Sequence, residues 1–296
     1  MMKQNKPITI VVASDNHFVV LIAALLKSID LNHKTDEHIN FYIIEDHISA
    51  ESKSQLEKIV SPERISIKWV KSREIVPHNV FFPVDSSSFP ISIFFRLFAP
   101  YIIDETLEKL IYLDVDTIVQ DDISKLWNIP LNEHTIGAVQ DYSKTIDCEW
   151  AGIPNYAALG LTPDTKYFNS GVLLINPKKW REEDITNKVI AILIKYKKYV
   201  RMADQYGLNV VFANKWLELD PKWNWFALYK DENPSLIHFV EIKPIFLNYK
   251  FNPTFKDEFY RYLSLTPWKN FTPISGNWRL LRKIQNKLKK ILLKLI

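Results

Sequence analysis

The first part of the chain alternates between short apolar, β-prone runs and helical segments, and this alternation restricts the fold more than any other feature. Strand-like runs occupy residues 8–13, 39–44 and 65–70, and helix-like segments occupy residues 18–29 and 49–60 between them. Strands that alternate with helices in this way form a parallel sheet that carries helices on both faces. The sequence therefore predicts an α/β fold.

The pattern continues less regularly to about residue 240. We expect helices at residues 91–101, 177–199 and 203–213, and strands at residues 110–113, 135–139 and 168–176 and near Leu217 and Ile237. The stretch from Tyr142 to Asp164 has no regular pattern and contains scattered Gly, Pro and Asn. A long irregular stretch in a compact domain is typical of a binding loop or a lid.

Two carboxylates, Asp114 and Asp116, follow the apolar run 110–113. The carboxyl ends of strands in α/β proteins border the crevice in which ligands bind. Carboxylate oxygens are hard ligands that suit Mn²⁺ or Mg²⁺, and such an ion also binds a diphosphate. Acid-x-acid triplets occur elsewhere in the chain, so the position of this pair at the end of a strand gives it its weight.

Composition excludes several classes of protein. The chain has only 6 glycines and no Gly-rich phosphate loop, which excludes the P-loop and dinucleotide-binding fingerprints. Cys148 is the only cysteine, which excludes a disulfide framework or a cysteine-based zinc site and indicates a reducing compartment. The polar N-terminus lacks a signal-peptide pattern, and the longest apolar run, Phe18–Leu26, is too short to span a bilayer. We therefore expect a cytoplasmic protein.

The positive charge of the chain is concentrated at its C-terminus. Residues 259–296 carry nine Lys and Arg and no acid, which leaves 29 basic and 34 acidic side chains, a charge of −5, before them. Leucine and isoleucine recur at helical spacing from Leu281 to Leu295, with basic residues on the other side. This pattern is typical of a helix that lies on an anionic membrane, with Trp278 as an interfacial anchor, or of a helix packed on the protein's own acidic body. Nucleic-acid binding is not expected, because no basic stripe with interleaved aromatics occurs elsewhere.

A series of short motifs is more specific than any single one. The motifs are VVASDNHF (11–18), FRL (95–97), KLIYLDVD (109–116), GAVQD (137–141), YFNSGVLLIN (167–176), DQ (204–205), HF (238–239) and KP (243–244). In this order the chain resembles glycosyltransferase family 8, whose members include bacterial lipooligosaccharide galactosyl- and glucosyltransferases. The resemblance implies a GT-A fold, which is a Rossmann-like α/β fold with a mixed central sheet. It also implies a divalent cation, usually Mn²⁺ with Mg²⁺ as the alternative, and a UDP-hexose donor.

The resemblance also assigns roles to individual residues. It implies that Asp114, Asp116 and His238 bind the metal. Donor contacts are implied for Ala13, Asp15, His17, Phe18, Arg96, Asp114, Val115, Asp116, Asn169, Ser170 and Lys243. The alternative for Asp15 is a helix N-cap, which is compatible with a donor contact. One departure from the family pattern is Glu241, which stands where the family often carries glycine.

Three further side chains are implied as catalytic, namely Asp141, Asp204 and Gln205. Gln205 occupies the position on the β-face of the sugar, where its amide is a poor nucleophile. A front-side transfer with retention of configuration is therefore expected, in which the leaving phosphate helps to deprotonate the acceptor. Asp141 and Asp204 would stabilise positive charge on the sugar ring.

Together these inferences predict a catalytic domain at residues 1–258 and a membrane-associating tail at residues 259–296. The expected activity is Mn²⁺-dependent transfer of galactose or glucose from a UDP-sugar to a glycan or glycolipid such as lipopolysaccharide core. Acceptor contacts are expected from residues 142–165 and from the segment after Lys250. The basic tail favours peripheral association with the inner face of the cytoplasmic membrane.

Two alternatives remain open at this point. One is a catalytically inactive relative that binds sugar nucleotides or glycans. The other is a haloacid-dehalogenase-type phosphatase, whose first motif the stretch DVDTIV at residues 114–119 also resembles. Against the phosphatase, that motif normally lies on the first strand of the fold, whereas this one lies well into the chain.

Overall fold

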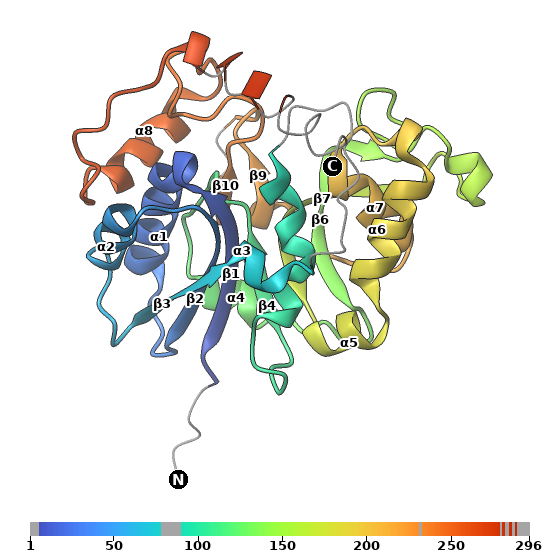
Figure 1. Cartoon of the computed structure of the whole chain (residues 1–296), viewed down its shortest axis with the longest axis horizontal. Helices are drawn as coiled ribbons and strands as arrows, with labels where there is room; N and C mark the ends of the chain where they lie inside the picture. The colour runs from blue at the N-terminus through green and yellow to red at the C-terminus, as the bar shows by residue number, and fades with distance from the viewer. Residues whose placement is uncertain are drawn as a thin grey trace.

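The computed structural model describes residues 6–77, 90–230 and 233–278, together with residues 280, 281, 284, 285 and 288. The described helices are all too short or too polar to span a lipid bilayer. Figure 1 shows a central sheet with helices on both sides, and the described C-terminal segment, in orange and red, lies at the top of the view.

The main sheet is mixed, as expected, and its strand order is β3-β2-β1-β4-β7-β6-β8. The strands are β1 (Ile8–Asp15), β2 (Ile39–Asp46), β3 (Ile65–Lys71), β4 (Leu110–Leu113), β6 (Ile136–Thr145), β7 (Lys166–Ile175) and β8 (Leu217–Glu218). Strand β1 runs parallel to β2 and β4, whereas β7 runs antiparallel to both β4 and β6. The carboxyl ends of β1 and β4 therefore meet at one edge, which is the upper edge in Figure 1.

A second, smaller sheet extends from that edge, with the order β5-β10-β9. It consists of β5 (Thr117–Val119), β9 (Trp225–Phe226) and β10 (Leu236–His238). Strand β5 begins directly after Asp116, and β10 pairs with it in an antiparallel register that sets His238 opposite Thr117. The backbone N–H of Phe239 also donates to the carbonyl of Asp116 at 2.8 Å. Strand pairing therefore brings residue 238 to the acid pair.

Helices cover the two faces of the main sheet and form two hydrophobic clusters. On one side lie α1 (Val19–Asn32), α2 (Ala50–Glu57) and α8 (Pro253–Leu263), and on the other α5 (Pro177–Glu182), α6 (Ile185–Lys195), α7 (Ala203–Val211) and the 3₁₀ helix η2 (Ile91–Tyr101). The shorter helices are α3 (Ser72–Ile75), α4 (Ile123–Trp127), η1 (Asn16–Phe18), η3 (Tyr156–Leu159), η4 (Lys197–Tyr199) and η5 (Pro221–Asn224). Helix α1 is buried along most of its length because it packs against both α8 and β5.

Two of the expected helices are irregular. The helix expected over residues 177–199 is divided, because Asp184 has a left-handed φ of 54°. Aspartate tolerates this conformation because its short side chain bonds locally, and here its carboxylate accepts the side-chain amide of Asn187 at 2.8 Å. The helix expected at residues 91–101 is present, and it is a 3₁₀ helix with Pro100 inside it. Proline lacks the N–H that continues an α-helical ladder.

The chain beyond α8 packs against the body of the protein. Helix α8 spans the expected boundary between residues 258 and 259. Ile274 then donates its N–H to the carbonyl of Ile245 at 2.8 Å and accepts the N–H of Leu247 at 2.9 Å. The described apolar residues after Trp278 are 47–58% exposed, and they are Leu280, Leu281, Ile284 and Leu288. Ile291, Leu292 and Leu295, which complete the expected apolar face, lie outside the described residues.

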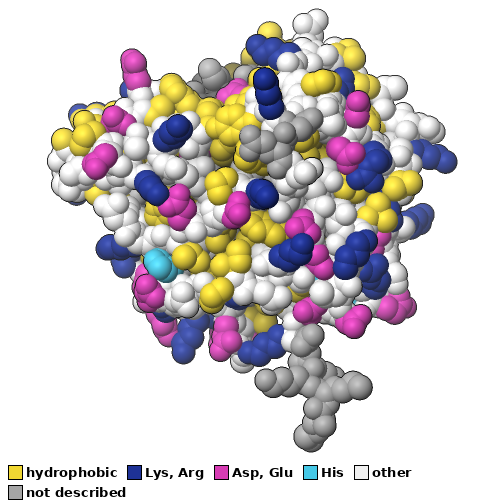
Figure 2. Space-filling view, turned by 180° about the vertical axis from the view of Figure 1, so that it is seen from behind, with side chains coloured by type: hydrophobic (Ala, Val, Ile, Leu, Met, Phe, Trp, Pro, Cys, Tyr) yellow, Lys and Arg dark blue, Asp and Glu magenta, His cyan; other side chains and the backbone are white. Residues whose placement is uncertain are grey.

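The face of the molecule that is hidden in Figure 1 carries a mixture of charges. Figure 2 shows acidic and basic side chains interspersed across it, around patches of hydrophobic side chains. Neither sign of charge dominates the described surface in that view.

Candidate functional site

A cavity of about 390 Å³ lies at the carboxyl ends of β1 and β4. It brings together side chains from both sheets, from η1, η2 and α7, and from the C-terminal segment. Every expected site residue except Asp15 lines it, namely Ala13, His17, Phe18, Arg96, Asp114, Val115, Asp116, Asp141, Asn169, Ser170, Asp204, Gln205, His238 and Lys243. Asp15 instead caps η1, where its carboxylate accepts the N–H of His17 at 2.9 Å.

Three potential metal ligands converge in this cavity. One ligand atom from each of Asp114, Asp116 and His238 lies within 4.8 Å of the other two. Nε2 of His238 lies 3.4 Å from Oδ1 of Asp116. Two carboxylates and one imidazole are a donor set that suits Mn²⁺, and Mg²⁺ accepts the same carboxylates. The residues therefore fit a divalent cation.

Positive side chains flank the two carboxylates. Lys243 forms an ion pair with Asp116, and a guanidinium nitrogen of Arg96 lies 3.1 Å from Asp114. Burial raises the pKa of Asp116, but Lys243 and His238 outweigh it and hold that pKa well below its usual range. Asp116 is therefore ionised at neutral pH and accepts hydrogen bonds without donating them.

Arg96 lies in the wall of the cavity and is buried, with 3% of its surface exposed. Its Nε lies 2.7 Å from Asp204, and its terminal nitrogen donates to the carbonyl of Ser170. Burial alone would lower the pKa of Arg96, but the carboxylates of Asp114 and Asp204 raise it above its ordinary value. In this arrangement Arg96 bridges the carboxylates of Asp114 and Asp204.

A chain of side-chain amides joins the metal-ligand cluster to the polar end of the cavity. Nδ2 of Asn224 donates to Oδ1 of Asn169 at 2.9 Å, and Nδ2 of Asn169 donates to Asp141 at 2.9 Å. Nε2 of Gln205 donates to the same carboxylate oxygen at 3.3 Å. The backbone N–H of Gly171 also donates to Oδ1 of Asn169, at 2.9 Å, and because a backbone N–H can only donate, this bond fixes which end of each amide accepts.

Asn224 also fixes the tautomer of His238. Since Nδ2 of Asn224 donates to Asn169, its Oδ1 is the acceptor for Nδ1–H of His238, at 2.9 Å. This bond leaves the lone pair of Nε2 directed toward the carboxylates, as a metal-ligating histidine requires. Asn224 could not be predicted from the sequence, because nothing in its local motif points to His238.

Replacing Asn224 with Ala is expected to weaken Mn²⁺ binding by about 10–100-fold, because loss of an outer-shell partner frees the imidazole. Electron paramagnetic resonance titration of Mn²⁺ into the purified variants measures this affinity. Asn224→Asp is the matched control, since it keeps the acceptor for Nδ1–H and should bind Mn²⁺ more tightly than Asn224→Ala. Equal affinity in the wild type and Asn224→Ala would contradict the role assigned to the amide.

Gly171 is a second site residue whose role has no local signal in the sequence. A Cβ atom built at this position would lie 2.4 Å from Cε1 of His238 and 2.9 Å from Oδ2 of Asp114. Its N–H donates to Oδ1 of Asn169 at 2.9 Å. The absence of a side chain therefore creates the space in which the imidazole and the carboxylate approach each other.

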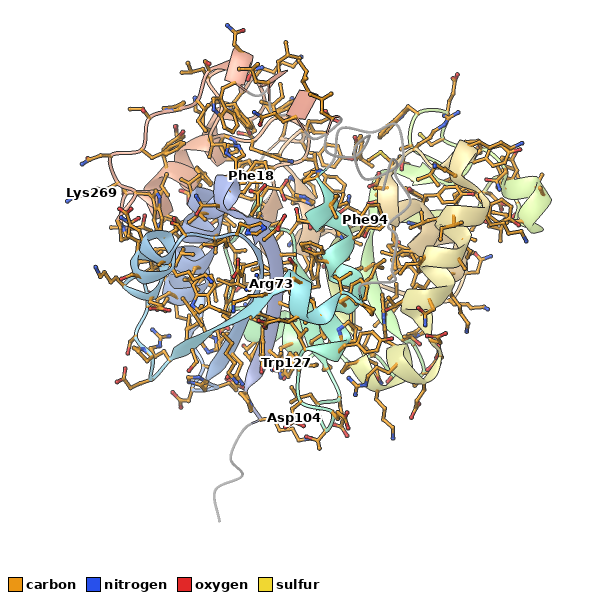
Figure 3. The ribbon with its side chains drawn as sticks, viewed as in Figure 1. Phe18, Arg73, Phe94, Asp104, Trp127 and Lys269 are labelled. Carbon is orange, nitrogen blue, oxygen red and sulfur yellow. The ribbon has the colours of Figure 1, made fainter. Side chains whose placement is uncertain are left out.

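The two ends of the cavity differ in chemistry. The end beside β1 carries the rings of His17, Phe18 and Trp278, whereas the end beside β7 carries polar groups such as Asn169 and Gln205. In the sheet β4 lies between β1 and β7, and neighbouring strands are about 4.8 Å apart. The acid pair at the end of β4 therefore lies between the aromatic end and the polar end. Figure 3 shows Phe18 at the same end of the molecule as the C-terminal segment.

Glu241, which departs from the expected family pattern, lies in the cavity wall with a left-handed φ of 64°. Glycine adopts this conformation without strain and glutamate does so rarely. Its carboxylate lies 3.5 Å from the hydroxyl of Tyr142, which also lines the cavity. Glu241 therefore occupies a backbone conformation that favours glycine.

Comparison with known proteins agrees with this geometry. The sequence model of Glycosyl transferase family 8 matches residues 9–245. General stress protein A of Bacillus subtilis is 28% identical over 290 residues, which cover 90% of this chain and 96% of that protein. The lipopolysaccharide 1,2-glucosyltransferase of Escherichia coli K12 is 26% identical and covers 88% of this chain and 78% of its own length. Other relatives, from Streptococcus pneumoniae, are longer, and the chain spans 57% of one and 55% of another.

Among solved structures, the fold is similar to that of the galactosyltransferase LgtC in complex with donor and acceptor sugar analogs. The TM-score is 0.70 at 23% identity, and the match covers 92% of this chain and 99% of that one. This likeness establishes the GT-A-like fold with its mixed central sheet.

Proposed function

Because the chain belongs to glycosyl transferase family 8, we propose that it is a retaining hexosyltransferase that uses UDP-galactose or UDP-glucose and requires Mn²⁺. The observation that carries this proposal is the convergence of Asp114, Asp116 and His238 between the two ends of one cavity. A UDP-hexose has the same order of chemistry, with a flat base, a charged diphosphate in the middle and a hydroxyl-rich sugar. Family membership contradicts the phosphatase alternative, and Asp114 follows β4 instead of the first strand.

The proposed donor position assigns a task to each part of the cavity. Asp114, Asp116 and His238 would hold the cation, with Val115 between the acids against the donor. A bound cation would act as a Lewis acid that stabilises negative charge on the leaving diphosphate. Lys243 would add a point charge at the phosphates. Ala13, Asp15, His17 and Phe18 would surround the nucleoside, with Asp15 acting through the turn that it caps.

Gln205 supports a front-side mechanism instead of a covalent one. Its Oε1 accepts the backbone N–H of Ser170 at 3.0 Å, and its Nε2 donates to Asp141. Both ends of the amide are thus used in positioning, and an amide is a poor nucleophile. We therefore propose that the leaving phosphate accepts the proton of the acceptor hydroxyl while Asp141 and Asp204 stabilise positive charge on the sugar ring. Arg96 would hold Asp114 and Asp204 in place for this step.

Release of UDP tests the proposed donor and metal. The protein is incubated with UDP-galactose or UDP-glucose and with Mn²⁺, Mg²⁺ or a chelator, and free UDP is measured. We expect release that requires the metal and favours one of the two sugars. Binding of UDP without any turnover, with acceptor present, would instead support an inactive sugar-nucleotide-binding relative.

An aromatic surface beside the cavity supports a saccharide acceptor. Trp150 is 50% exposed and lies in the segment expected to contact the acceptor. Its ring lies 4.8 Å from that of Tyr142, and Phe226 packs edge-on against Tyr142 at 5.3 Å. A supported, exposed indole is suited to stacking on the apolar face of a sugar ring. We propose that the acceptor glycan binds across Trp150 and Tyr142.

Replacing Trp150 with Ala is expected to raise the KM for an oligosaccharide acceptor by about 5–10-fold, which corresponds to about 1 kcal/mol of lost stacking. Hydrolysis of the donor without acceptor should not change. Tyr101→Ala, which removes a 45% exposed aromatic ring outside the cavity, is the matched control. An unchanged acceptor KM in Trp150→Ala would remove this residue from the acceptor site.

The C-terminal tail supports a glycolipid acceptor such as lipopolysaccharide core, and the activity in the name of the Escherichia coli relative agrees with such an acceptor. Exposed Leu280, Leu281, Ile284 and Leu288, with nine basic residues after Glu258, are suited to an anionic membrane surface. We propose that the protein acts at the inner face of the cytoplasmic membrane, with residues 1–258 as the catalytic part and the following tail as the attachment.

A further inference from the structure

Trp278 connects the C-terminal segment to the cavity. Its ring stacks on the ring of His17, with a centroid distance of 3.9 Å and an interplanar angle of 28°. His17 in turn lies against Phe18, at 4.5 Å and 57°. All three residues line the aromatic end of the cavity. The ring expected to anchor the protein in a membrane therefore lies in the wall of the proposed donor site.

The segment that carries Trp278 is fixed to the body a few residues earlier. Phe246 and Ile274 form an isolated parallel bridge, and Ile274 bonds to residues on both sides of Phe246. Phe246 itself lines the cavity. Trp278 lies only four residues after Ile274, so the backbone that carries its ring is held to the body through this bridge.

The exposed apolar residues begin directly after this ring. Leu280 and Leu281 are each 58% exposed, and only Arg279 separates Leu280 from Trp278. A membrane surface that binds these leucines therefore also restricts the motion of the backbone at Trp278. Two ligands that favour the same arrangement of one element increase each other's affinity by the same factor.

We infer that Trp278 makes the C-terminal segment part of the donor site. Binding of a nucleoside diphosphate and binding of the tail to an anionic membrane therefore favour each other. This inference rests on the proposed donor and on the proposed membrane attachment. It assigns to Trp278 the outer wall of the nucleoside pocket, with His17 and Phe18 as the inner wall. Donor binding is then strongest where a membrane-bound acceptor is also present.

The first test measures UDP binding by isothermal titration calorimetry in the presence of Mn²⁺. Trp278→Ala is expected to weaken UDP binding about 10-fold, and Trp278→Phe should retain most of the affinity because it keeps an aromatic ring. Trp268→Ala is the matched control, since Trp268 packs against the core in the same segment but does not line the cavity. Wild-type UDP affinity in a folded Trp278→Ala protein would overturn the inference.

The second test adds vesicles of phosphatidylglycerol and phosphatidylcholine. We expect the vesicles to tighten UDP binding, and UDP with Mn²⁺ to raise the affinity for vesicles, measured by sedimentation, by the same factor. Trp278→Ala should still bind vesicles through its leucines and basic residues but should lose this mutual effect. Vesicle binding with unchanged UDP affinity would overturn the coupling alone, whereas absence of vesicle binding would overturn the membrane proposal as well. Failure to transfer hexose, with both bindings intact, would count against the proposed activity and not against the coupling.

Discussion

Replacing Asp116 with Ala is expected to reduce metal-dependent release of UDP by at least about a thousandfold, since it removes a ligand of the cation that stabilises the leaving group. Asp116 also lies between Lys243 and His238, so its loss brings two cationic or basic groups together without a counter-charge. The rate of UDP release and the affinity for Mn²⁺ are measured in parallel, and we expect both to fall.

Two further variants make this result interpretable. Asp116→Asn keeps the shape of the side chain and removes its charge, so it should also lose activity while it perturbs the fold less. Glu182→Ala removes an exposed carboxylate from another acidic triplet, outside the cavity, and should behave as the wild type. An Asp116→Asn protein that binds Mn²⁺ and releases UDP at the normal rate would show that the cation site lies elsewhere.

Replacing Gly171 with Ala is expected to reduce activity by about a hundredfold or more, a loss comparable with displacing a reacting group by about an ångström. The new methyl group would lie 2.4 Å from His238 and 2.9 Å from Asp114, so at least one of these side chains must move. The glycine is needed for space, because its backbone φ is not in the left-handed region. Mn²⁺ affinity and UDP release measure the effect, and thermal unfolding reports any change in stability.

Gly276→Ala is the matched control for this substitution. Its nearest neighbour would be Asn248 at 3.6 Å, an ordinary van der Waals contact, so it should leave both Mn²⁺ affinity and UDP release unchanged. Normal Mn²⁺ affinity in Gly171→Ala would mean that His238 does not contribute to the cation site in the way proposed.

The strand pattern and the acid pair could be predicted from sequence, because both depend on neighbours in the chain. The alternation before Val70 predicted three parallel strands, and Asp114 and Asp116 follow a buried run that became β4. The family resemblance supplied His238, which is remote in sequence but matches a motif. Each of these features is marked by a periodic pattern or a short motif, and both can be recognised in a single sequence.

Contacts between distant residues explain what could not be predicted. Gly171 matters because of atoms from His238 and Asp114, and a glycine in a strand carries no sign of what approaches it. Asn224 reaches His238 only after β9 and β10 pair. Similarly, the pattern of its own segment predicts Trp278 as a membrane anchor and carries no sign that its ring stacks on His17.

The pairing of β5 with β10 has a consequence for how the protein is made. The two acids leave the ribosome more than a hundred residues before His238, so a nascent chain carries an incomplete set of ligands for most of its synthesis. Pairing of β5 with β10 closes the long loop between them. This is a late and comparatively slow event, because closing a long loop loses chain entropy before the strand contacts form. Chains released before residue 238 would have the first strands of the sheet but would lack the imidazole that completes the cluster.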